Sequence, residues 1–213
     1  MQECGGFMTN VVSYKAEELD ISIKEVLRYL GYGRNSITEG DEAFAMSMVD
    51  KARADMKPMG CYMRAPVGIG NNGYIEMPYG RVNSANLSRN LSGCNEIYMF
   101  AVTLGAGYDR ALNRAGVSSM TEAAYYQAVG AAAIEAVCQL MIERLELEVY
   151  EEMKTLRPRY SPGFGDYGLE NQKGIFDCLN PAKYIGLTLM DTMVMSPEKS
   201  VTAIVGIEEL REA

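Results

Sequence analysis

The chain has 213 residues, of which 48% are hydrophobic and 23% are charged, and this composition argues against a disordered protein. A chain of this length can bury one sizeable core, and we expect a single domain over residues 1–213. The formal net charge is −8 and no basic stripe is visible, which argues against binding to nucleic acid or to an anionic membrane.

Histidine is absent from the sequence. This excludes Ser-His-Asp and Cys-His mechanisms, most zinc sites and an imidazole ligand to cobalt or iron. The five cysteines are scattered, odd in number and never spaced as Cys-x-x-Cys, which predicts reduced thiols in a cytoplasmic protein. No apolar run approaches the ~20 residues of a membrane-spanning helix, and the first ten residues do not resemble a secretory signal.

The N-terminal half is predicted to contain two helices followed by short strands. Residues 1–12 are expected to be loosely ordered. Ile21–Tyr32 has the apolar spacing of an amphipathic helix, and Asp41–Met56 is a second predicted helix. Cys61–Tyr79 interleaves apolar residues with glycine and proline, which predicts strands joined by a turn at Asn71-Asn72-Gly73.

The central part of the chain carries the two strongest patterns. Glu96–Thr103 is the clearest buried strand, and a helix is expected to begin near Asp109. Ser119–Met153 is the longest helical pattern. Ser119 can cap this helix, and Glu122 follows three residues later, as a capping box requires.

The C-terminal part is predicted to form one helix and two strands. Leu169–Leu179 has a helical pattern with a stop signal at Asn180-Pro181. Tyr184–Ile207 reads as two β-branched strands around Ser196–Lys199. Because strands and helices alternate irregularly, the sequence favours an α+β fold over a repeating βαβ arrangement.

Glu135 is the only charged residue between Ala123 and Ile142, within the long predicted helix. A helix that is apolar nearly all round is buried, and a buried carboxylate needs a cation, hydrogen-bond donors or a proton. Two interpretations stay open. Glu135 forms a structural ion pair with an internal Arg or Lys or lies at the edge of the buried stripe, or it faces the ammonium or sulfonium of a ligand.

The segment from Arg159 to Asp166 is the second candidate site. The guanidinium of Arg159 can hold a carboxylate bidentately. Phe164 can lie against a cation or a flat base, and glycines at positions 163 and 165 permit positive φ and close backbone approach. The alternative is a plain turn after the helix. Asp166 is expected to cap the following helix rather than to meet a ligand.

Three other features receive plainer interpretations. Arg157 and Arg159 alternate with Pro158 and Tyr160 in an extended segment, where successive side chains point in opposite directions, and one of the arginines is expected to face inward. Gly105-Ala106-Gly107 lacks the third glycine of a dinucleotide motif, because Arg110 stands in its place, so a strand-to-helix turn is favoured. A methionine-rich run is expected to pack in the core, although methionines also suit adaptable contact surfaces; it comprises Met190, Met193 and Met195.

The run from Arg159 to Gly165 resembles the Arg-x-x-x-Gly-Tyr-Pro signature of the reactivation domain of cobalamin-dependent methionine synthase. The resemblance is carried by Arg159, Gly163 and Phe164, with Pro162 and Gly165 beside them. The chain is most similar to free-standing homologues of that domain. The stretch from Gly186 to Thr202 resembles the hairpin of the family, and Glu143-Arg144 fits the end of its long helix. The similarity covers residues 121–207 well and the N-terminal half loosely.

The resemblance implies a bent antiparallel sheet flanked by helices that binds S-adenosylmethionine at Glu135, Arg159, Gly163 and Phe164. In this register, Arg159 would hold the methionine carboxylate and Glu135 the positive charge of the ligand. Phe164 would form a wall, and backbone amides near Gly163 would orient the adenosyl group or the ribose. The resemblance implies no metal ligand and no catalytic acid or base in this chain.

The function implied by the resemblance is the reductive reactivation of an oxidised cobalamin, with S-adenosylmethionine as the methyl donor. A partner would hold the cobalamin: a cobalamin-binding methionine synthase or a related corrinoid protein. An electron donor would be a further partner. Whether the chain contributes methyltransferase activity as a reactivation subunit stays open.

Two departures from the family pattern and two alternative functions accompany this expectation. Phe164 lacks the hydroxyl of the family's tyrosine, and Gly165 replaces a proline, which loosens the loop. The first alternative is a non-catalytic adaptor that caps a corrinoid protein. The second is a small-molecule methyltransferase with Gly105 and Gly107 in its site.

Overall fold

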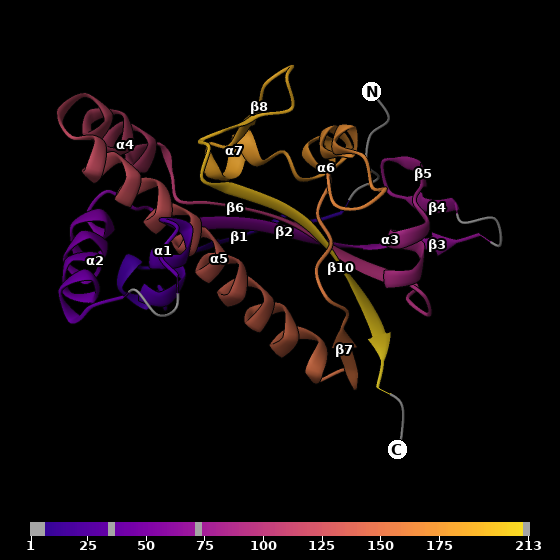
Figure 1. Cartoon of the computed structure of the whole chain (residues 1–213). Coiled ribbons are helices and arrows are strands. Elements are labelled where there is room, and N and C mark those ends of the chain that lie inside the picture. Colours follow the sequence, from indigo (N-terminus) through magenta and orange to yellow (C-terminus); the bar gives the residue numbers. More distant parts are fainter. Residues whose placement is uncertain (1–6, 34–36, 71–73, 211–213) are drawn as a thin grey trace.

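The computed structural model describes residues 7–33, 37–70 and 74–210, and these residues form an α+β fold around a bent antiparallel sheet (Figure 1). The sheet has five strands in the order β1–β2–β6–β10–β7. Their bounds are Asn10–Ser13 (β1), Met59–Pro66 (β2), Glu96–Thr103 (β6), Ser200–Glu209 (β10) and Lys154–Leu156 (β7). Every neighbouring pair is antiparallel. The predicted fold class is therefore confirmed.

Two small sheets accompany the main one. Gly68–Ile69 (β3), Tyr74–Met77 (β4) and Gly80–Asn83 (β5) form the first, and Thr188–Leu189 (β8) pairs with Met195–Ser196 (β9) in the second. The predicted turn at Asn71-Asn72-Gly73 lies outside the described residues.

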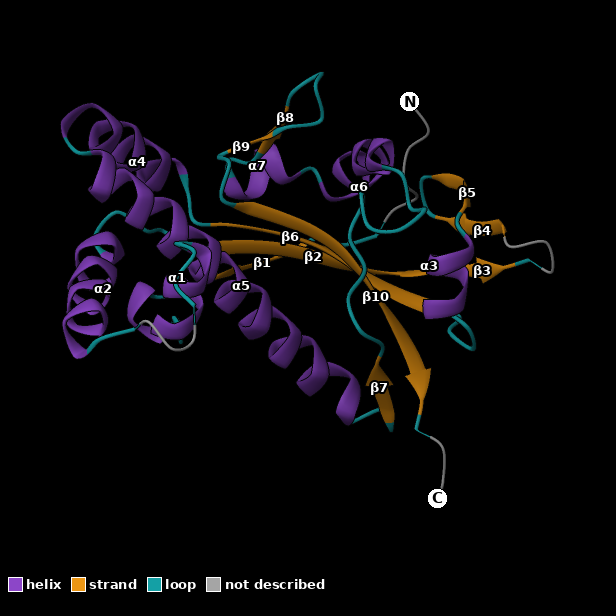
Figure 2. Cartoon of the chain, in the orientation of Figure 1, coloured by secondary structure: helices purple, strands orange, loops and turns teal. Residues whose placement is uncertain are grey.

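Helices cover both faces of the main sheet (Figure 2). One face packs against α1, α2, α4 and α5, and the other packs against α3, α6 and α7. Short 3-10 turns precede two of these helices. The helical bounds are Ala16–Glu18 (η1), Ile23–Tyr29 (α1), Glu39–Arg53 (α2), Ala85–Asn90 (α3), Ala106–Ser118 (α4), Met120–Tyr150 (α5), Leu169–Asn171 (η2), Gln172–Leu179 (α6) and Pro181–Ile185 (α7).

Strand β6 lies at the centre of the sheet and has the bounds that its apolar run predicts. Side chains alternate between the two faces of a strand. Tyr98 and Phe100 therefore join the core under α5, whereas Ile97 and Met99 join the core under α6 and α7. All four are at most 2% exposed, so β6 links the two cores.

Helix α5 begins as predicted, but its capping box is only half formed. The hydroxyl of Ser119 accepts a hydrogen bond from the backbone N–H of Glu122 at 3.2 Å. The carboxylate of Glu122 accepts instead from Lys51 on α2 at 2.5 Å. The side chain that would complete the box therefore joins α5 to α2.

The ends of the chain differ from the sequence-based expectations. Residues 10–12, expected to be loosely ordered, belong to strand β1, which pairs with β2. Of the two strands predicted within Tyr184–Ile207, the first is replaced by the end of α7 and by the local β8–β9 hairpin. The second is β10, which pairs with β6 and β7 and not with the hairpin.

Cys61, Cys94 and Cys138 are free and buried, whereas Cys178 is disulfide-bonded, so the prediction of reduced thiols is wrong at that position. Across the described part of the chain, no helix is both long and apolar enough to cross a membrane.

Candidate functional site

The structure brings two of the predicted site residues into direct contact. Glu135 lies on α5, and Arg159 lies in the loop that follows β7. The Nη2 atom of Arg159 donates a hydrogen bond to the Oε2 atom of Glu135, so the two side chains form an ion pair. An acid and a cation that are distant in the sequence therefore meet at one place on the surface.

The expectation that Glu135 is buried is wrong. Its side chain is 48% exposed and that of Arg159 is 30% exposed. The neighbouring Ala131 and Ala136 are also partly exposed, because α5 turns a face of small side chains outward at this point. The structure shows the first of the two open interpretations, with one difference. Glu135 lies at the edge of the buried face and forms an ion pair, but its partner Arg159 is partly exposed and not internal.

A cleft of about 560 Å³ opens beside this ion pair. Glu135, Arg159 and Phe164 line it, so three of the four predicted binding residues share one concave surface. The volume falls within the range of small-molecule sites, which is roughly 300–1,000 Å³. The remaining walls come from the start of β10 and from the segments around Leu169 and Met193.

The loop from Arg159 to Asp166 turns through its glycines. Gly163 has φ = 88° and Gly165 has φ = 57°, as their positions predict. The N–H of Gly163 donates to the carbonyl of Tyr167 at 2.7 Å, and the N–H of Phe164 donates to the carbonyl of Ser161 at 3.1 Å. These two amides close the loop on itself, so the arrangement gives Gly163 the role of a turn former.

Phe164 stands at the mouth of the cleft. Its side chain is 69% exposed. The ring packs edge-on against Tyr160, with ring centroids 5.7 Å apart and an interplanar angle of 86°. Because one edge is supported by protein and much of the ring is open, Phe164 offers an aromatic face to a flat or cationic group.

Asp166 caps a helix, but not the one that the sequence predicts. Its carboxylate accepts hydrogen bonds from the hydroxyl of Ser84 at 2.5 Å and from the backbone N–H groups of Ala85 and Asn86 at 2.8 and 3.2 Å. These groups lie at the start of α3. The hydrogen bond from Ser84 lowers the pKa of Asp166. Asp166 thus ties the cleft loop to an element 80 residues earlier in the chain.

Arg157 and Arg159 contact different parts of the molecule. Arg157 donates to the carbonyl of Ser92 at 3.0 Å and pairs with Glu208 at 2.8 Å. Arg159 turns instead toward α5 and lies close to Cys138. Burial raises the pKa of the Cys138 thiol to about 12, an effect that the charge of Arg159 opposes.

Several lining residues escaped the sequence-based reasoning. Gln172 is 3% exposed, and its amide donates to the carbonyl of Met193 at 3.5 Å. Thr202 is also 3% exposed and lies between Val201 and Ala203 in β10. The burial of both side chains is a property of the fold, so no local pattern in the sequence marks them as lining residues.

The methionine-rich run does not simply fill the core. Met193 and Met195 line the cleft, and Met190 is 46% exposed. Met195 also packs against the core on the α6 side of the sheet. For Met190 and Met193, the interpretation as an adaptable contact surface fits the structure better than core packing.

The glycines at the start of α4 are packing features. Gly105 has φ = 85°, and a Cβ atom at Gly107 would lie 2.8 Å from the carbonyl oxygen of Asp55. Neither glycine lines the cleft. The main sheet is antiparallel, so the dinucleotide interpretation is wrong, and so is the methyltransferase alternative that needs a doubly wound parallel sheet.

The side chains of the described ranges do not assemble a metal site, since no group of three or more cysteines and carboxylates is placed to hold a metal ion. What the cleft offers is one cation, one anion, an aromatic face and methionine walls. Such a set can bind and orient a small zwitterion.

Comparisons with known proteins agree with the fold. No family model matches the sequence, and no curated protein matches it. Among solved structures, the chain is similar to one described as the crystal structure of the MetH reactivation domain bound to AdoHcy. The TM-score is 0.69 and the identity 16%, over 98% of this chain and 81% of that chain. The two chains share a fold, and the fold implied by the sequence resemblance is confirmed.

Proposed function

We propose that the protein binds S-adenosylmethionine in the cleft beside Glu135 and Arg159. We further propose that it acts in trans in the reductive reactivation of a cobalamin-dependent methionine synthase or a related corrinoid protein. One observation carries the proposal: the Glu135–Arg159 ion pair lies in a cleft of small-molecule size, within a chain that has the fold of a MetH reactivation domain.

The charges of the cleft match the amino-acid end of the ligand. That end is a zwitterion, with a carboxylate and an ammonium on one carbon. The guanidinium of Arg159 has five N–H donors, of which one is used by Glu135, and so it can donate two hydrogen bonds to the carboxylate of a ligand. Glu135 can then face the ammonium or the sulfonium. Because both side chains are partly exposed, their mutual contact contributes about 1 kcal/mol at most and is readily rearranged.

The apolar walls suit the rest of the ligand. Phe164 can lie against the sulfonium or against the adenine ring. Leu169, Met193 and Met195 supply flexible apolar contacts around it. The hydroxyl expected from the family's tyrosine is absent at Phe164, so the aromatic ring acts through its face alone.

In this proposal, the residues of the chain bind the ligand, orient it and shield it from water. When bound, S-adenosylmethionine supplies the methyl group. Arg159 and Glu135 would fix the direction in which the ligand lies, so that proximity to the acceptor carries the rate effect. A partner docked over the cleft would exclude water and protect a strongly reducing cobalt centre. None of these tasks requires a histidine.

The surface around the cleft fits a covering partner. Phe164, Leu169, Met190 and Val194 are 69%, 43%, 46% and 45% exposed, and Phe164 and Leu169 line the mouth of the cleft. A corrinoid protein that holds the cobalamin would bury these side chains. The net charge of −8 favours an electron donor with a basic docking surface. The cytoplasmic location that the sequence predicts belongs to the same proposal.

A reactivation assay tests the proposal. Cobalamin-dependent methionine synthase without its own reactivation domain is oxidised to its inactive form and then mixed with a chemical reductant, S-adenosylmethionine and this protein. We expect methyl transfer to recover with the wild-type protein and not with Arg159→Ala. Recovery that is equal with and without the protein contradicts the trans role.

The adaptor alternative has one observation in its favour, since Arg159 already has a partner in Glu135. In that case the protein would cap a corrinoid protein without using the ligand. Capture of the purified methionine synthase by both wild type and Arg159→Ala, with no reactivation by either, would favour the adaptor.

A further inference from the structure

The cleft beside Arg159 contains an unpaired segment of sheet edge at Thr202. This residue lies in β10 and lines the cleft, although it is only 3% exposed. On the edge of β10 that faces away from β6, Ile204 exchanges both backbone hydrogen bonds with Tyr160, at 2.8 and 2.9 Å. Alternate residues of a strand direct their N–H and C=O groups to the same edge. Thr202 therefore directs both of its backbone groups to this edge as well.

The chain that pairs with β10 turns away before it reaches Thr202. Continuation of the register from Tyr160 would place Pro162 opposite Thr202, and proline has no N–H to donate. The chain turns here instead, and the N–H of Phe164 donates to the carbonyl of Ser161 at 3.1 Å. Within the described ranges, neither the N–H nor the C=O of Thr202 has a hydrogen-bond partner. Unpaired backbone groups at a buried residue are rare and indicate an absent partner.

Gln172 adds a second buried polar group to this part of the cleft. It lies at the start of α6, lines the cleft and is 3% exposed. Its Nε2 atom donates to the carbonyl of Met193 at 3.5 Å, and its Oε1 atom accepts no hydrogen bond from the described residues. We call Thr202 and Gln172 the polar floor of the cleft. The polar floor offers one backbone donor and two acceptors, and it carries no charge.

The amino edge of adenine complements the polar floor. This edge presents an amino group that donates and, beside it in the same plane, a ring nitrogen that accepts. The ring nitrogen can accept from the N–H of Thr202, while the amino group donates to the C=O of Thr202 and to the Oε1 atom of Gln172. Leu169 and Met195, which also line the cleft, can cover the faces of the flat ring. A 6-oxopurine reverses the donor and the acceptor on this edge, so it would face like groups.

We infer that the polar floor, Thr202 and Gln172, recognises the adenine of the ligand and selects it against 6-oxopurines. The inference rests on the proposed binding of S-adenosylmethionine, whose amino-acid end is assigned to Arg159 and Glu135. It assigns the opposite end of the same ligand to a different part of the cleft. Rejection of the wrong base follows from the buried groups that it would leave unpaired.

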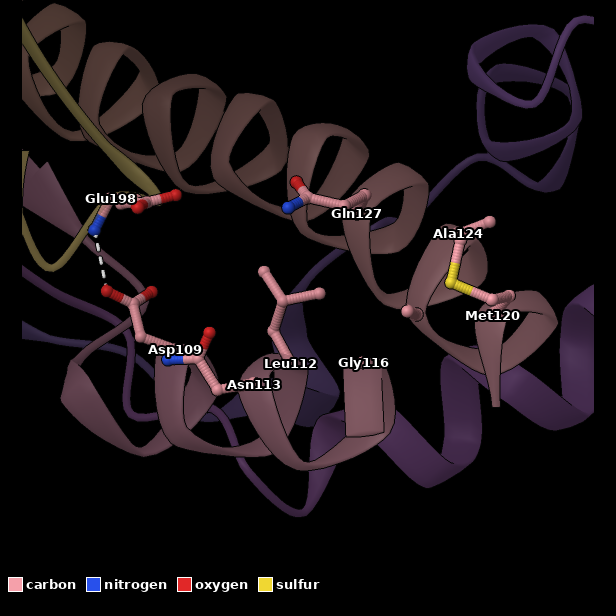
Figure 3. Close-up of a pocket in the computed structure, with 9 residues that line it drawn as sticks. Asp109, Leu112, Asn113, Gly116, Met120, Ala124, Gln127 and Glu198 are labelled. Atoms are coloured by element: carbon pink, nitrogen blue, oxygen red, sulfur yellow. Dashed lines mark hydrogen bonds between the residues drawn. The ribbon is translucent and has the colours of Figure 1, made fainter. Parts of the chain in front are cut away.

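A separate cavity provides an internal reference for the test. It has a volume of about 430 Å³, lies between α4 and α5 and shares no lining residue with the cleft (Figure 3). Its polar end is closed by a hydrogen bond of 2.8 Å from the backbone N–H of Glu198 to the carboxylate of Asp109 (Figure 3). A nucleoside bound at the polar floor should leave the amides of this cavity unchanged.

Titration of the full chain with 5′-methylthioadenosine and with 5′-methylthioinosine, followed by amide chemical shifts, tests the inference. Both nucleosides lack the amino-acid end of S-adenosylmethionine, so their comparison reports on the base. We expect saturable shifts at Thr202 and Gln172 with methylthioadenosine and roughly 100-fold weaker binding of methylthioinosine. Leu112 and Asn113, which line the α4–α5 cavity, should show no shift. Equal affinities for the two nucleosides, or shifts centred on the α4–α5 cavity, overturn the inference.

A variant of the polar floor sharpens the test. Gln172→Met removes the amide at nearly constant volume, so it should weaken methylthioadenosine binding about 3- to 10-fold and narrow the preference over methylthioinosine. The matched control Gln139→Met replaces an exposed glutamine of α5 that does not line the cleft, and it should bind as wild type does. Unchanged binding and preference in Gln172→Met overturn the inference.

A parallel titration with S-adenosylmethionine separates this inference from the proposed function. Saturable binding of S-adenosylmethionine together with equal affinities for the two nucleosides would leave the proposed binding intact and overturn only the assignment of the adenine. Absence of binding by both S-adenosylmethionine and methylthioadenosine would overturn both.

Discussion

Arg159 and Glu135 form an ion pair that joins the loop after β7 to the outer face of α5. The pair is partly exposed, and its two charges lie side by side at the edge of one cleft. An exposed ion pair contributes little to stability. A pair that adds little to the fold but offers both signs of charge to a concave surface is suited to hold a zwitterion.

Replacement of Arg159 separates these two contributions. Arg159→Ala is expected to change the free energy of unfolding by about 1 kcal/mol or less, because the ion pair is solvent-exposed. The same change should weaken S-adenosylmethionine binding by roughly 10- to 100-fold, since a charge-assisted hydrogen bond is lost. The affinity of Arg159→Lys for S-adenosylmethionine should lie between those of wild type and Arg159→Ala, because an ammonium cannot bind a carboxylate bidentately. Urea unfolding and calorimetric titration measure the two effects. A large loss of stability with unchanged affinity would assign the pair a structural role.

Gly165 is expected to be the least replaceable position in the cleft loop. Its φ of 57° disfavours any side chain, and an added Cβ atom would lie 2.7 Å from both the Tyr160 hydroxyl and the Asn86 amide nitrogen. Gly165→Ala should therefore destabilise the protein by about 1–3 kcal/mol and weaken ligand binding.

Gly116 provides the matched control for that substitution. It lies in α4, and an added Cβ atom would meet nothing within 4 Å. Gly116→Ala should stabilise the protein by up to about 1 kcal/mol, because alanine is the better helix former. Thermal unfolding of both variants makes the comparison. Equal shifts of the two melting temperatures would mean that the loop tolerates a side chain at Gly165.

Asp166 should contribute to stability in a pH-dependent way. Hydrogen bonds from Ser84 and from the N-terminus of α3 lower the pKa of its carboxyl below the ordinary value of 3.8. The contribution is therefore fully present above about pH 3.8 and is lost as the pH falls below the lowered value. Asp166→Ala should have a lower melting temperature than wild type at pH 7, and Asp166→Asn should lie between them. Circular dichroism melts that show the same difference at pH 7 and at pH 2.5 would argue against a charge-dependent cap.

A ring of four charges should govern part of the acid sensitivity. Glu152 pairs with Arg64 at 2.5 Å and with Lys154 at 2.9 Å, and both of these cations also pair with Glu96. The hydrogen bonds from Arg64 and then from Lys154 lower the pKa of Glu152 to about 2.

The sign of this effect follows from the lowered pKa. The stabilisation from Glu152 is present above its ordinary pKa of 4.5 and disappears as the pH falls toward 2. Glu152→Gln should lose about 1 kcal/mol or less at pH 7, because the side chain is 41% exposed and solvent screens its charge. The difference should vanish near pH 2. Urea unfolding across this pH range checks it, and a difference that grows in acid would contradict the assigned cause.

Some elements could be predicted from the sequence because their cause is local. Glu96–Thr103 is a continuous apolar run, and such a run fits a central strand that is buried on both faces. The start of α5 follows from the capping hydroxyl of Ser119. The two glycines of the cleft loop adopt positive φ because the turn demands it.

Other features depend on contacts that local patterns do not contain. Glu135 was expected to be buried, because alanines count as apolar in a helical pattern, yet small side chains also suit a helix face that borders a cleft. Asp166 caps α3, which precedes it by 80 residues, and no local signal shows this partner. The expectation that Arg159 and Glu135 belong to one site rests on chemistry and resemblance rather than on periodicity.

A crystal structure of the protein soaked with S-adenosylmethionine tests the central claim most directly. We predict that the ligand carboxylate lies within hydrogen-bonding distance of the Arg159 guanidinium, with the ligand ammonium or sulfonium facing Glu135 and the Phe164 ring against the ligand. Density for the ligand elsewhere on the surface, with the Glu135–Arg159 ion pair intact and the cleft filled only by water, would contradict the account.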